Sequence, residues 1–201
     1  MARTALQTNA NPMRTQLLDA AEIEFADAGF KGARLADIAA RAGIRRPSLL
    51  YHFPSKEALY TSVVERTFAL LGEVLAAAMA AARSFEERVE APARYFADFL
   101  EGRPAAGRIL LREVLDDHGP GRDILLKQGV PILATVEGFL RGDGAERIPD
   151  DFPLRAALMQ SVANLLLWSA AGPLRESLWG GGHETTALGR AIWQLGPAPT
   201  E

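Results

Sequence analysis

The stretch "AGIRRPSLLYHF", residues 42–53, sets two adjacent arginines beside an apolar and aromatic run. Gly43 suits a tight turn, and Pro47 is tolerated in the first turn of a helix, where its missing N–H is no loss. Pro54 then ends the segment. We therefore expect a short helix over 46–52, whose apolar side chains anchor it to a small core while the arginines point away from that core.

Two more helices are predicted before this one. From 12 to 28 the apolar residues recur at spacings of three and four, as on one face of a helix, and Gly29 ends the pattern. A short helix over 35–42 follows and stops at Gly43. A short helix, a tight glycine turn and a second short helix are the layout of a helix-turn-helix.

The charge of the chain is unevenly distributed, although the net charge is −3. Between Lys31 and Lys56, six Lys and Arg residues accompany a single acid, Asp37. In a helix-turn-helix the second helix enters the DNA major groove, where arginine can bind O6 and N7 of guanine with two hydrogen bonds. Flanking polar groups contact phosphates and fix the register. The candidate DNA-contacting residues, which flank or begin the third helix, are Arg34, Arg45, Arg46, Pro47, Ser48, Tyr51, His52 and Lys56.

The rest of the sequence also predicts helices, so the expected fold class is all-α. Ser55 is a candidate N-cap for a long helix that runs to about Ala82. Further helices are expected near 85–101, 104–117, 121–141, 153–171 and 185–195, with Pro131 kinking or splitting the one that contains it. We expect a DNA-binding domain at 1–54, with 1–11 as a flexible arm, and a larger helical domain at 55–201, joined through the long helix 55–82.

Composition narrows the functional classes. The chain has no cysteine, which excludes disulfides and thiolate metal sites. The longest apolar runs fall short of the roughly 20 residues of a membrane span, and the N-terminus lacks a signal-peptide pattern, so we expect a soluble, cytoplasmic protein. His118 and His183 each lie beside carboxylates but lack metal-ligand spacing. Because no nucleophile elbow or phosphate-binding loop is present, we expect no enzyme activity, no cofactor and no metal.

Residues 17–60 resemble the DNA-binding region of the tetracycline-repressor (TetR) family. The resemblance rests on residues at fixed offsets: Gly29-Phe30, Asp37-Ile38-Ala39, Ala42-Gly43-Ile44, Ser48, His52-Phe53 and Lys56-Glu57-Ala58-Leu59. Three positions depart from the family pattern. Arg34 replaces the usual capping Thr, Arg45 replaces a frequent Ser, and Leu50 replaces a phosphate-binding Tyr, with Tyr51 next to it. The operator sequence is therefore not carried over from the family.

The resemblance implies an all-helical homodimeric regulator, most often a repressor, whose larger C-terminal domain binds a small molecule and then releases a palindromic operator. The second domain is acidic overall and rich in Leu, Phe and Trp, which favours an apolar or cationic aromatic ligand. Candidate pocket residues, most of them apolar, are Phe96, Phe99, Leu100, Leu111, His118, Met159, Asn164 and Trp168. Asn164 is polar within an apolar run, and we assign it either to the pocket or to the dimer interface.

Two long segments, 121–141 and 153–171, are candidate dimerisation helices. The second is apolar nearly all round, which one small domain would struggle to bury, and its small residues permit close helix approach. The resemblance implies that such a pair packs against its two-fold mate as a four-helix bundle. Candidate interface residues on these segments are Val136, Leu140, Ala156, Ala157, Gln160, Ser161, Ala163 and Leu167.

Two other classes of protein remain as alternatives. The first is a helical protein-interaction module whose basic patch binds acidic partners, and the second is a small helical enzyme that uses a cavity of the second domain. Sequence-selective binding to duplex DNA that falls steeply with salt separates a regulator from both.

Overall fold

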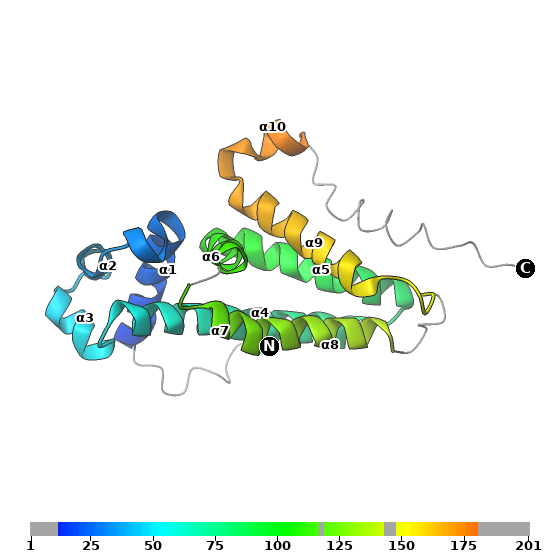
Figure 1. The fold of residues 1–201 in the computed structure, drawn as a ribbon, viewed down its shortest axis with the longest axis horizontal. Coiled ribbons are helices and arrows are strands. Elements are labelled where there is room, and N and C mark those ends of the chain that lie inside the picture. Colours follow the sequence, from blue (N-terminus) through cyan, green and yellow to red (C-terminus); the bar gives the residue numbers. More distant parts are fainter. Residues whose placement is uncertain (1–11, 117–118, 143–147, 181–201) are drawn as a thin grey trace, which may run out of the picture.

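The computed structural model describes residues 12–116, 119–142 and 148–180, and within these ranges the regular structure is helical (Figure 1). Three helices form the N-terminal part: α1 (Pro12–Gly32), α2 (Leu35–Arg41) and α3 (Arg46–His52). The long helix α4 (Lys56–Ala81) runs from this part along the larger helical body. The all-α fold class, with an N-terminal helix-turn-helix and a helical C-terminal region, is thereby confirmed.

The helix-turn-helix is shaped by local capping. Gly43 has a φ of 68°, in the left-handed region that favours glycine. The N–H of Ile44 donates to the carbonyl of Ala39 at 2.9 Å, and that of Gly43 to Ala40 at 3.0 Å, so the last carbonyls of α2 are satisfied. At the start of α4 the Ser55 hydroxyl accepts from the N–H of Ala58 at 3.1 Å, as predicted for an N-cap.

The larger part continues with α5 (Phe85–Gly102), α6 (Pro104–Leu115), α7 (Arg122–Ile124), α8 (Val130–Leu140) and α9 (Leu154–Ala170). The single helix expected over 121–141 is divided, because a π-helical turn (Leu125–Gly129) separates α7 from α8. Pro131 lies in the first turn of α8, where no N–H is required of it. The turn is tightly packed at Gly129, since an added Cβ would lie 2.9 Å from Cδ1 of Leu125 and 3.0 Å from the ring of Phe68.

Several boundaries differ from the predicted ones. Helix α1 continues to Gly32 across a break at Gly29, whose φ of 70° interrupts the regular helix where the sequence predicted its end. Helix α6 ends at Leu115, two residues before the predicted 117. A 3-10 turn (Gly172–Leu174) and α10 (Arg175–Trp179) follow α9 and were not predicted. The helix expected over 185–195 lies outside the described residues.

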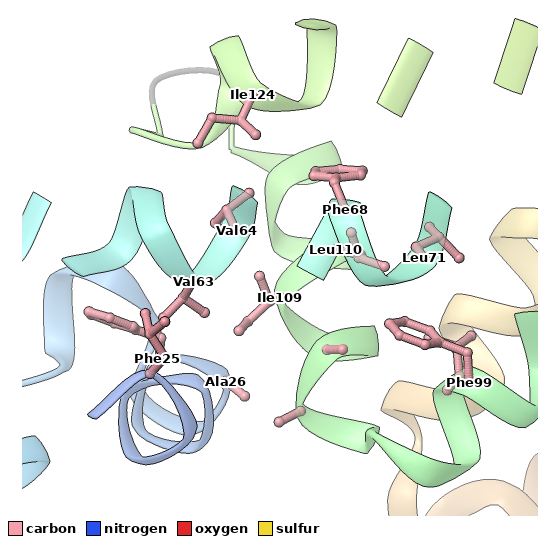
Figure 2. Packing of buried hydrophobic residues seen from close by; sticks show 14 of the residues in the cluster. Phe25, Ala26, Val63, Val64, Phe68, Leu71, Phe99, Ile109, Leu110 and Ile124 are labelled. Carbon is pink, nitrogen blue, oxygen red and sulfur yellow. The ribbon is translucent and has the colours of Figure 1, made fainter. Parts of the chain in front are cut away.

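One continuous apolar core joins the N-terminal helices to the larger part. Figure 2 shows Phe25 of α1 packed near Val63 of α4 and Ile109 of α6, with Leu110 continuing the same helix toward Phe99 of α5. The three helices α1, α4 and α6 therefore form the junction through which the two parts of the chain contact each other. Within the described ranges no helix is long and apolar enough to cross a membrane.

Candidate functional sites

The third helix presents two chemically different faces. Leu49 is fully buried and Phe53, which directly follows the helix, is 1% exposed, so both side chains belong to the core. Arg45, Arg46 and Ser48 are exposed at its N-terminal end, as is Pro47. Helix α3 therefore has the buried apolar side chains and the exposed cationic N-terminal end that the sequence predicted.

The guanidinium groups at this end are unpaired within the described part of the chain. Neither Arg45 nor Arg46 forms an ion pair or a side-chain hydrogen bond with any described residue. Arg34, which precedes α2, is also exposed and leaves that helix without a side-chain N-cap. Three cationic side chains are thus available to a ligand outside the chain.

The remaining predicted contact residues lie beside this surface. Tyr51 is 87% exposed and packs edge-on against the ring of the half-buried His52, with ring centroids 5.5 Å apart. Lys56 is more constrained than the sequence suggested. Its ammonium donates to the carbonyls of Lys31 at 3.3 Å and Ala33 at 3.2 Å and lies 4.8 Å from the ring centroid of Phe30. Lys56 therefore fixes the loop between α1 and α2, and one of its three N–H donors remains for another partner.

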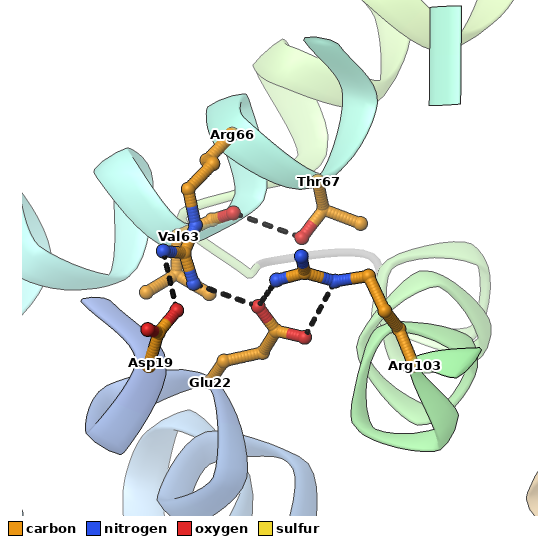
Figure 3. A network of polar contacts seen from close by, with 6 residues as sticks. All are labelled: Asp19, Glu22, Val63, Arg66, Thr67 and Arg103. Carbon is orange, nitrogen blue, oxygen red and sulfur yellow. Dashed lines mark hydrogen bonds and ion pairs between the residues drawn. The ribbon is translucent and has the colours of Figure 1, made fainter. Parts of the chain in front are cut away.

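A polar network joins the same three helices that share the core (Figure 3). Glu22 of α1 is 5% exposed and accepts hydrogen bonds from Arg66 of α4, at 2.8 Å, and from Arg103, the residue before α6. Arg66 also pairs with Asp19 at 2.7 Å. Because the carboxylate of Glu22 is buried and shared by two guanidinium groups, it links α1 to both α4 and the start of α6.

Helix α6 contacts α1 through two more arginines. Arg108 pairs with Asp27 at 2.9 Å, and Arg112 donates to the carbonyls of Ala26 and Asp27 at 3.4 and 3.3 Å. The guanidinium of Arg112 also lies 3.1 Å from where a Cβ on Gly29 would stand. These contacts place α6 directly against the break in α1.

A buried tyrosine and a buried carboxyl group meet at this junction. Tyr60 of α4 is 2% exposed and Glu113 of α6 is 3% exposed, and the Tyr60 hydroxyl donates to Oε1 of Glu113. Oε2 of Glu113 has no hydrogen-bond partner in the described structure. Burial raises the pKa of Glu113, the hydrogen bond from Tyr60 opposes that rise, and the nearby Asp116 adds to it. Burial, followed by the bond to Glu113, also raises the pKa of Tyr60, so that the phenol remains the donor.

The larger part contains an apolar cavity of about 340 Å³ between α4, α5, α6, α8 and α9. Its wall is almost entirely hydrocarbon, with Phe68 and Leu71 from α4, Leu110 from α6 and Leu166 from α9 among the lining side chains. Among the described lining residues only Ser161 carries a hydroxyl, and it already donates to the carbonyl of Ala157 at 3.1 Å. The cavity therefore suits an uncharged, apolar group.

Two of the predicted pocket residues, Phe96 and Met159, line this cavity. Phe99, Leu100 and Trp168 are buried in the core, and Leu111 is half-buried against it, but none of them reaches the cavity. Asn164 accepts a hydrogen bond from the indole N–H of Trp179 in α10 at 3.2 Å, which supplies the polar partner that its position requires. His118 and His183 lie outside the described residues.

The predicted interface residues divide between the inside and the outside of the chain. Ala156, Gln160, Ala163 and Leu167 are exposed along one face of α9. Val136 and Leu140 of α8 are buried and line the cavity, Ser161 faces it too, and Ala157 is buried. Val136, Leu140 and Ser161 thus face the cavity and Ala157 packs in the core, and sequence periodicity alone did not show which side of each helix faces inward.

Residues 17–63 match the model of a family described as "Bacterial regulatory proteins, tetR family". This match places the N-terminal part of the chain, residues 17–63, in the TetR family. Members of this family are regulators and not enzymes, in agreement with the expectation from the sequence. Within the described ranges, no three His, Asp or Glu side chains gather as a metal site would require.

Individual transcriptional regulators are also similar to this chain in sequence or in structure. The chain is 38% identical over 88 residues to the "HTH-type transcriptional activator FasR" of Mycolicibacterium smegmatis, an alignment that covers 44% of this chain and 40% of FasR. The structure of the fatty acid degradation regulator FadR from Bacillus halodurans has a TM-score of 0.74 at 18% identity and covers 94% of this chain and 96% of FadR. FadR from Bacillus subtilis, in complex with stearoyl-CoA, has a TM-score of 0.68 at 16% identity over 93% and 99%. At these identities the two structures show a shared fold alone.

Proposed function

We propose that this TetR-family protein is a homodimeric transcriptional regulator that binds a palindromic DNA operator and releases it when a small apolar molecule enters the cavity. The observation that carries the proposal is the exposed pair Arg45 and Arg46, which no described carboxylate neutralises, at the start of a helix held by Leu49. A surface of this kind is matched by guanine edges and phosphates in the major groove.

In the proposed DNA-binding surface, some residues contact base edges and others contact the sugar-phosphate backbone. Arg45, Arg46 and Ser48 enter the groove, with Pro47 holding the first turn, and they contact base edges. Arg34, Tyr51, His52 and the remaining donor of Lys56 contact the backbone on either side. A single short helix contacts few bases, so two copies related by a two-fold axis multiply the affinity for a palindrome. Binding to genomic DNA would also place the protein in the cytoplasm, as expected.

The proposed effector is a molecule with an aliphatic chain. The cavity offers hydrocarbon on nearly every side, and no lining side chain among the described residues carries a charge. A charged head group would therefore remain at the opening, whereas an alkyl chain is fully compatible with the wall. The complex of the Bacillus subtilis FadR with stearoyl-CoA supports this choice, since that protein shares the fold and binds a long acyl chain.

Helix α6 provides the proposed route from effector to DNA. Leu110 and Val114 of α6 line the cavity, while Arg108 and Arg112 of the same helix bind to α1. An effector that favours one position of α6 then shifts α1 and, with it, the distance between the two α3 helices of a dimer. This mechanism requires that the effector bind more tightly to the DNA-released arrangement than to the other.

The proposed sign of regulation is repression, because release by an effector then switches genes on. The relative FasR is named an activator, so a reporter assay must measure the sign. The first experiment selects bound duplexes from a random library and measures their affinity at several salt concentrations. A palindromic consensus, bound with an affinity that falls steeply with salt, supports the regulator. Binding without sequence preference, or no binding to duplex DNA, would favour the protein-interaction module instead.

A further inference from the structure

We propose that the cavity binds an alkyl chain in one orientation, with the terminal methyl group at a closed end, where Val89 and Leu158 limit the length of the chain. The inference rests on the aliphatic effector proposed above and adds which end of that molecule lies deepest and how long it is. It follows from the course of the cavity along α8, the polar contacts that fix one end of it, and the exposure of the side chains at the other end.

The cavity is elongated and follows α8. One face of this helix lines it from Val130 in the first turn, through Val136, to Leu140 in the last. Helix α4 lies alongside, because an added Cβ on Gly129 would stand 3.0 Å from the ring of Phe68, another lining residue. From Val130 to Leu140 an α-helix rises by about 15 Å. A space of this shape suits an extended chain better than a compact ring system.

Polar contacts fix the end of the cavity near the last turn of α8. Arg88 of α5 donates to the carbonyl of Phe139, and its guanidinium carbon lies 4.4 Å from the centroid of the Phe139 ring. Nε of Arg155 in α9 donates to Glu137 at 2.8 Å. Arg141 donates to two carbonyls of the segment before α9, at 3.2 and 3.1 Å. Figure 1 shows α8 and α9 converging at this end, which cannot widen without the loss of several hydrogen bonds.

The lining side chains at this closed end are hydrocarbon. Val89 directly follows Arg88, and Leu158 lies three residues after Arg155, so both line the cavity beside the polar contacts. Leu140 and Leu158 are 2% and 9% exposed. The arginines behind them do not line the cavity. A polar head group placed here would lose its water without gaining a partner, whereas a methyl group has no such loss.

The other end of the cavity is open to solvent. Val114 at the end of α6, Leu126 in the π-helical turn and Val130 at the start of α8 line the cavity and are between 43% and 53% exposed. Met159 of α9 is the fourth large lining side chain among the described residues that is exposed to this degree. Because three of the four belong to this end, the head group keeps its water between α6 and the π-helical turn.

The dimensions of the cavity set the length of the chain. The roughly 15 Å along α8 correspond to an extended alkyl chain of about 12 carbons. A volume of about 340 Å³ holds a similar number of methylene groups, since each is about as large as a water molecule in the liquid, roughly 30 Å³. We therefore expect affinity to rise about fourfold with each added carbon, up to a limit of about 12 carbons, and to rise no further beyond it.

Straight-chain alcohols from octan-1-ol to hexadecan-1-ol test this limit, with a dissociation constant measured for each. Val89→Phe adds four carbon atoms at the closed end, so the limit should fall to about 10 carbons while octan-1-ol binds as it does to the wild type. Leu158→Ala removes three carbon atoms from the same end, so the limit should rise to about 14 carbons.

The matched control is Val130→Phe, the same exchange at the open end. It should change the affinity of all the alcohols by one common factor and leave the limit at about 12 carbons. Circular dichroism establishes that each variant is folded, and Val89→Phe with Val130→Phe decides the question even if Leu158→Ala does not fold. A limit that falls in Val130→Phe but not in Val89→Phe overturns the orientation, and a limit that moves in neither overturns the assigned role of the closed end.

The same series keeps this inference apart from the proposed function. If none of the alcohols binds, the aliphatic effector proposed above is wrong, and so is the inference. If the alcohols bind and release the operator while the closed-end variants leave the limit unchanged, the effector stands and the orientation is wrong. If the limit moves as expected but bound alcohols do not release the operator, the orientation stands and the proposed route from the cavity to DNA is wrong.

Discussion

Tyr60 on α4 donates its hydroxyl hydrogen bond to Glu113 on α6, and this contact lies where the N-terminal helices meet the larger part of the chain. Both side chains are buried, and the second carboxylate oxygen of Glu113 has no partner in the described structure. A buried carboxylate with one unsatisfied oxygen costs stability, because water would solvate that oxygen in the unfolded chain. The hydrogen bond therefore holds α4 to α6, while the charge of the buried carboxylate reduces the stability of the fold.

The first prediction concerns the charge of Glu113. Burial raises its pKa above the ordinary value of 4.5, so the folded protein favours the protonated acid. Its unfavourable effect is absent below pH 4.5, grows as pH rises through that value, and is complete once pH exceeds the folded-state pKa. Glu113→Gln keeps an oxygen for Tyr60 and carries no charge. We expect it to match the wild type near pH 4 and to melt at a higher temperature at pH 8.

The control for this prediction is Glu65→Gln, the same exchange at an exposed position of α4. Thermal denaturation is followed by circular dichroism from pH 4 to pH 9. The argument is wrong if the difference between Glu113→Gln and the wild type does not depend on pH. Tyr60→Phe removes the hydrogen-bond donor to Oε1 of the carboxylate and should instead destabilise the protein by about 1–3 kcal/mol at pH 7.

The second prediction concerns the carboxylate that joins three helices. Glu22→Gln leaves Arg66 and Arg103 without their shared counter-ion. A fully buried pair broken in this way costs about 3–5 kcal/mol, but both arginines are partly exposed and Arg66 retains Asp19, so we expect a loss of about 2 kcal/mol. Asp27→Asn breaks the exposed pair with Arg108 and should cost less than about 1 kcal/mol. Urea denaturation measures both, and equal losses would contradict the assigned role of Glu22.

The third prediction concerns base recognition. Arg46→Ala should weaken binding to the selected operator by about 1–3 kcal/mol, the value for one bidentate hydrogen-bonded contact with guanine. It should also relax the sequence preference at one base pair of each half-site. Arg94→Ala removes an exposed arginine from α5, which lies in the larger part of the chain, and should leave operator affinity unchanged. Fluorescence anisotropy titrations of both variants decide the matter. Unaltered affinity and selectivity in Arg46→Ala would remove that residue from the interface.

The fourth prediction separates two roles of Lys56. As a phosphate contact, it should lower affinity for every sequence when changed to alanine and reduce the salt slope of binding by about one. As the donor to the carbonyls of Lys31 and Ala33, it should also contribute about 1 kcal/mol to stability. Lys127→Ala, at an exposed position of the π-helical turn, is the control for both measurements. A loss of stability with an unchanged salt slope would leave Lys56 with the structural role alone.

The N-terminal part was predictable because short-range chemistry determines it. Gly43 requires a left-handed backbone, Ser55 caps the helix that follows, and Pro54 prevents α3 from continuing, so the bounds of α3 follow from residues within a few positions of each other. The outward direction of Arg45 and Arg46 follows in turn from the burial of Leu49 and Phe53.

The larger part was less predictable because long-range packing determines it. Helix α9 is apolar on several sides, so the sequence does not tell which side faces the core, the cavity or a partner, and it did not show that Ser161 lines the cavity. The pairing of Tyr60 with Glu113 joins residues 53 positions apart, and no local pattern indicates it. A carboxylate within the apolar face of α6 was the available signal, because such a group needs a partner from another helix.

The last prediction fills the cavity. Leu133 of α8 is half-buried in the cavity wall, and Leu133→Trp places a large ring in a space of about 340 Å³. Dodecan-1-ol, an uncharged aliphatic probe, should raise the melting temperature of the wild type, and its affinity for the variant should fall at least tenfold. Because α8, the helix that carries Leu133, lies away from α3 (Figure 1), the variant should still bind the operator but no longer release it when the probe is added. Leu178→Trp, the same exchange at an exposed position of α10, should behave as the wild type does.

Probe binding that survives in Leu133→Trp would place the effector somewhere other than this cavity. If the variant loses probe binding but the probe still releases it from the operator, the proposed link between the cavity and DNA binding is wrong.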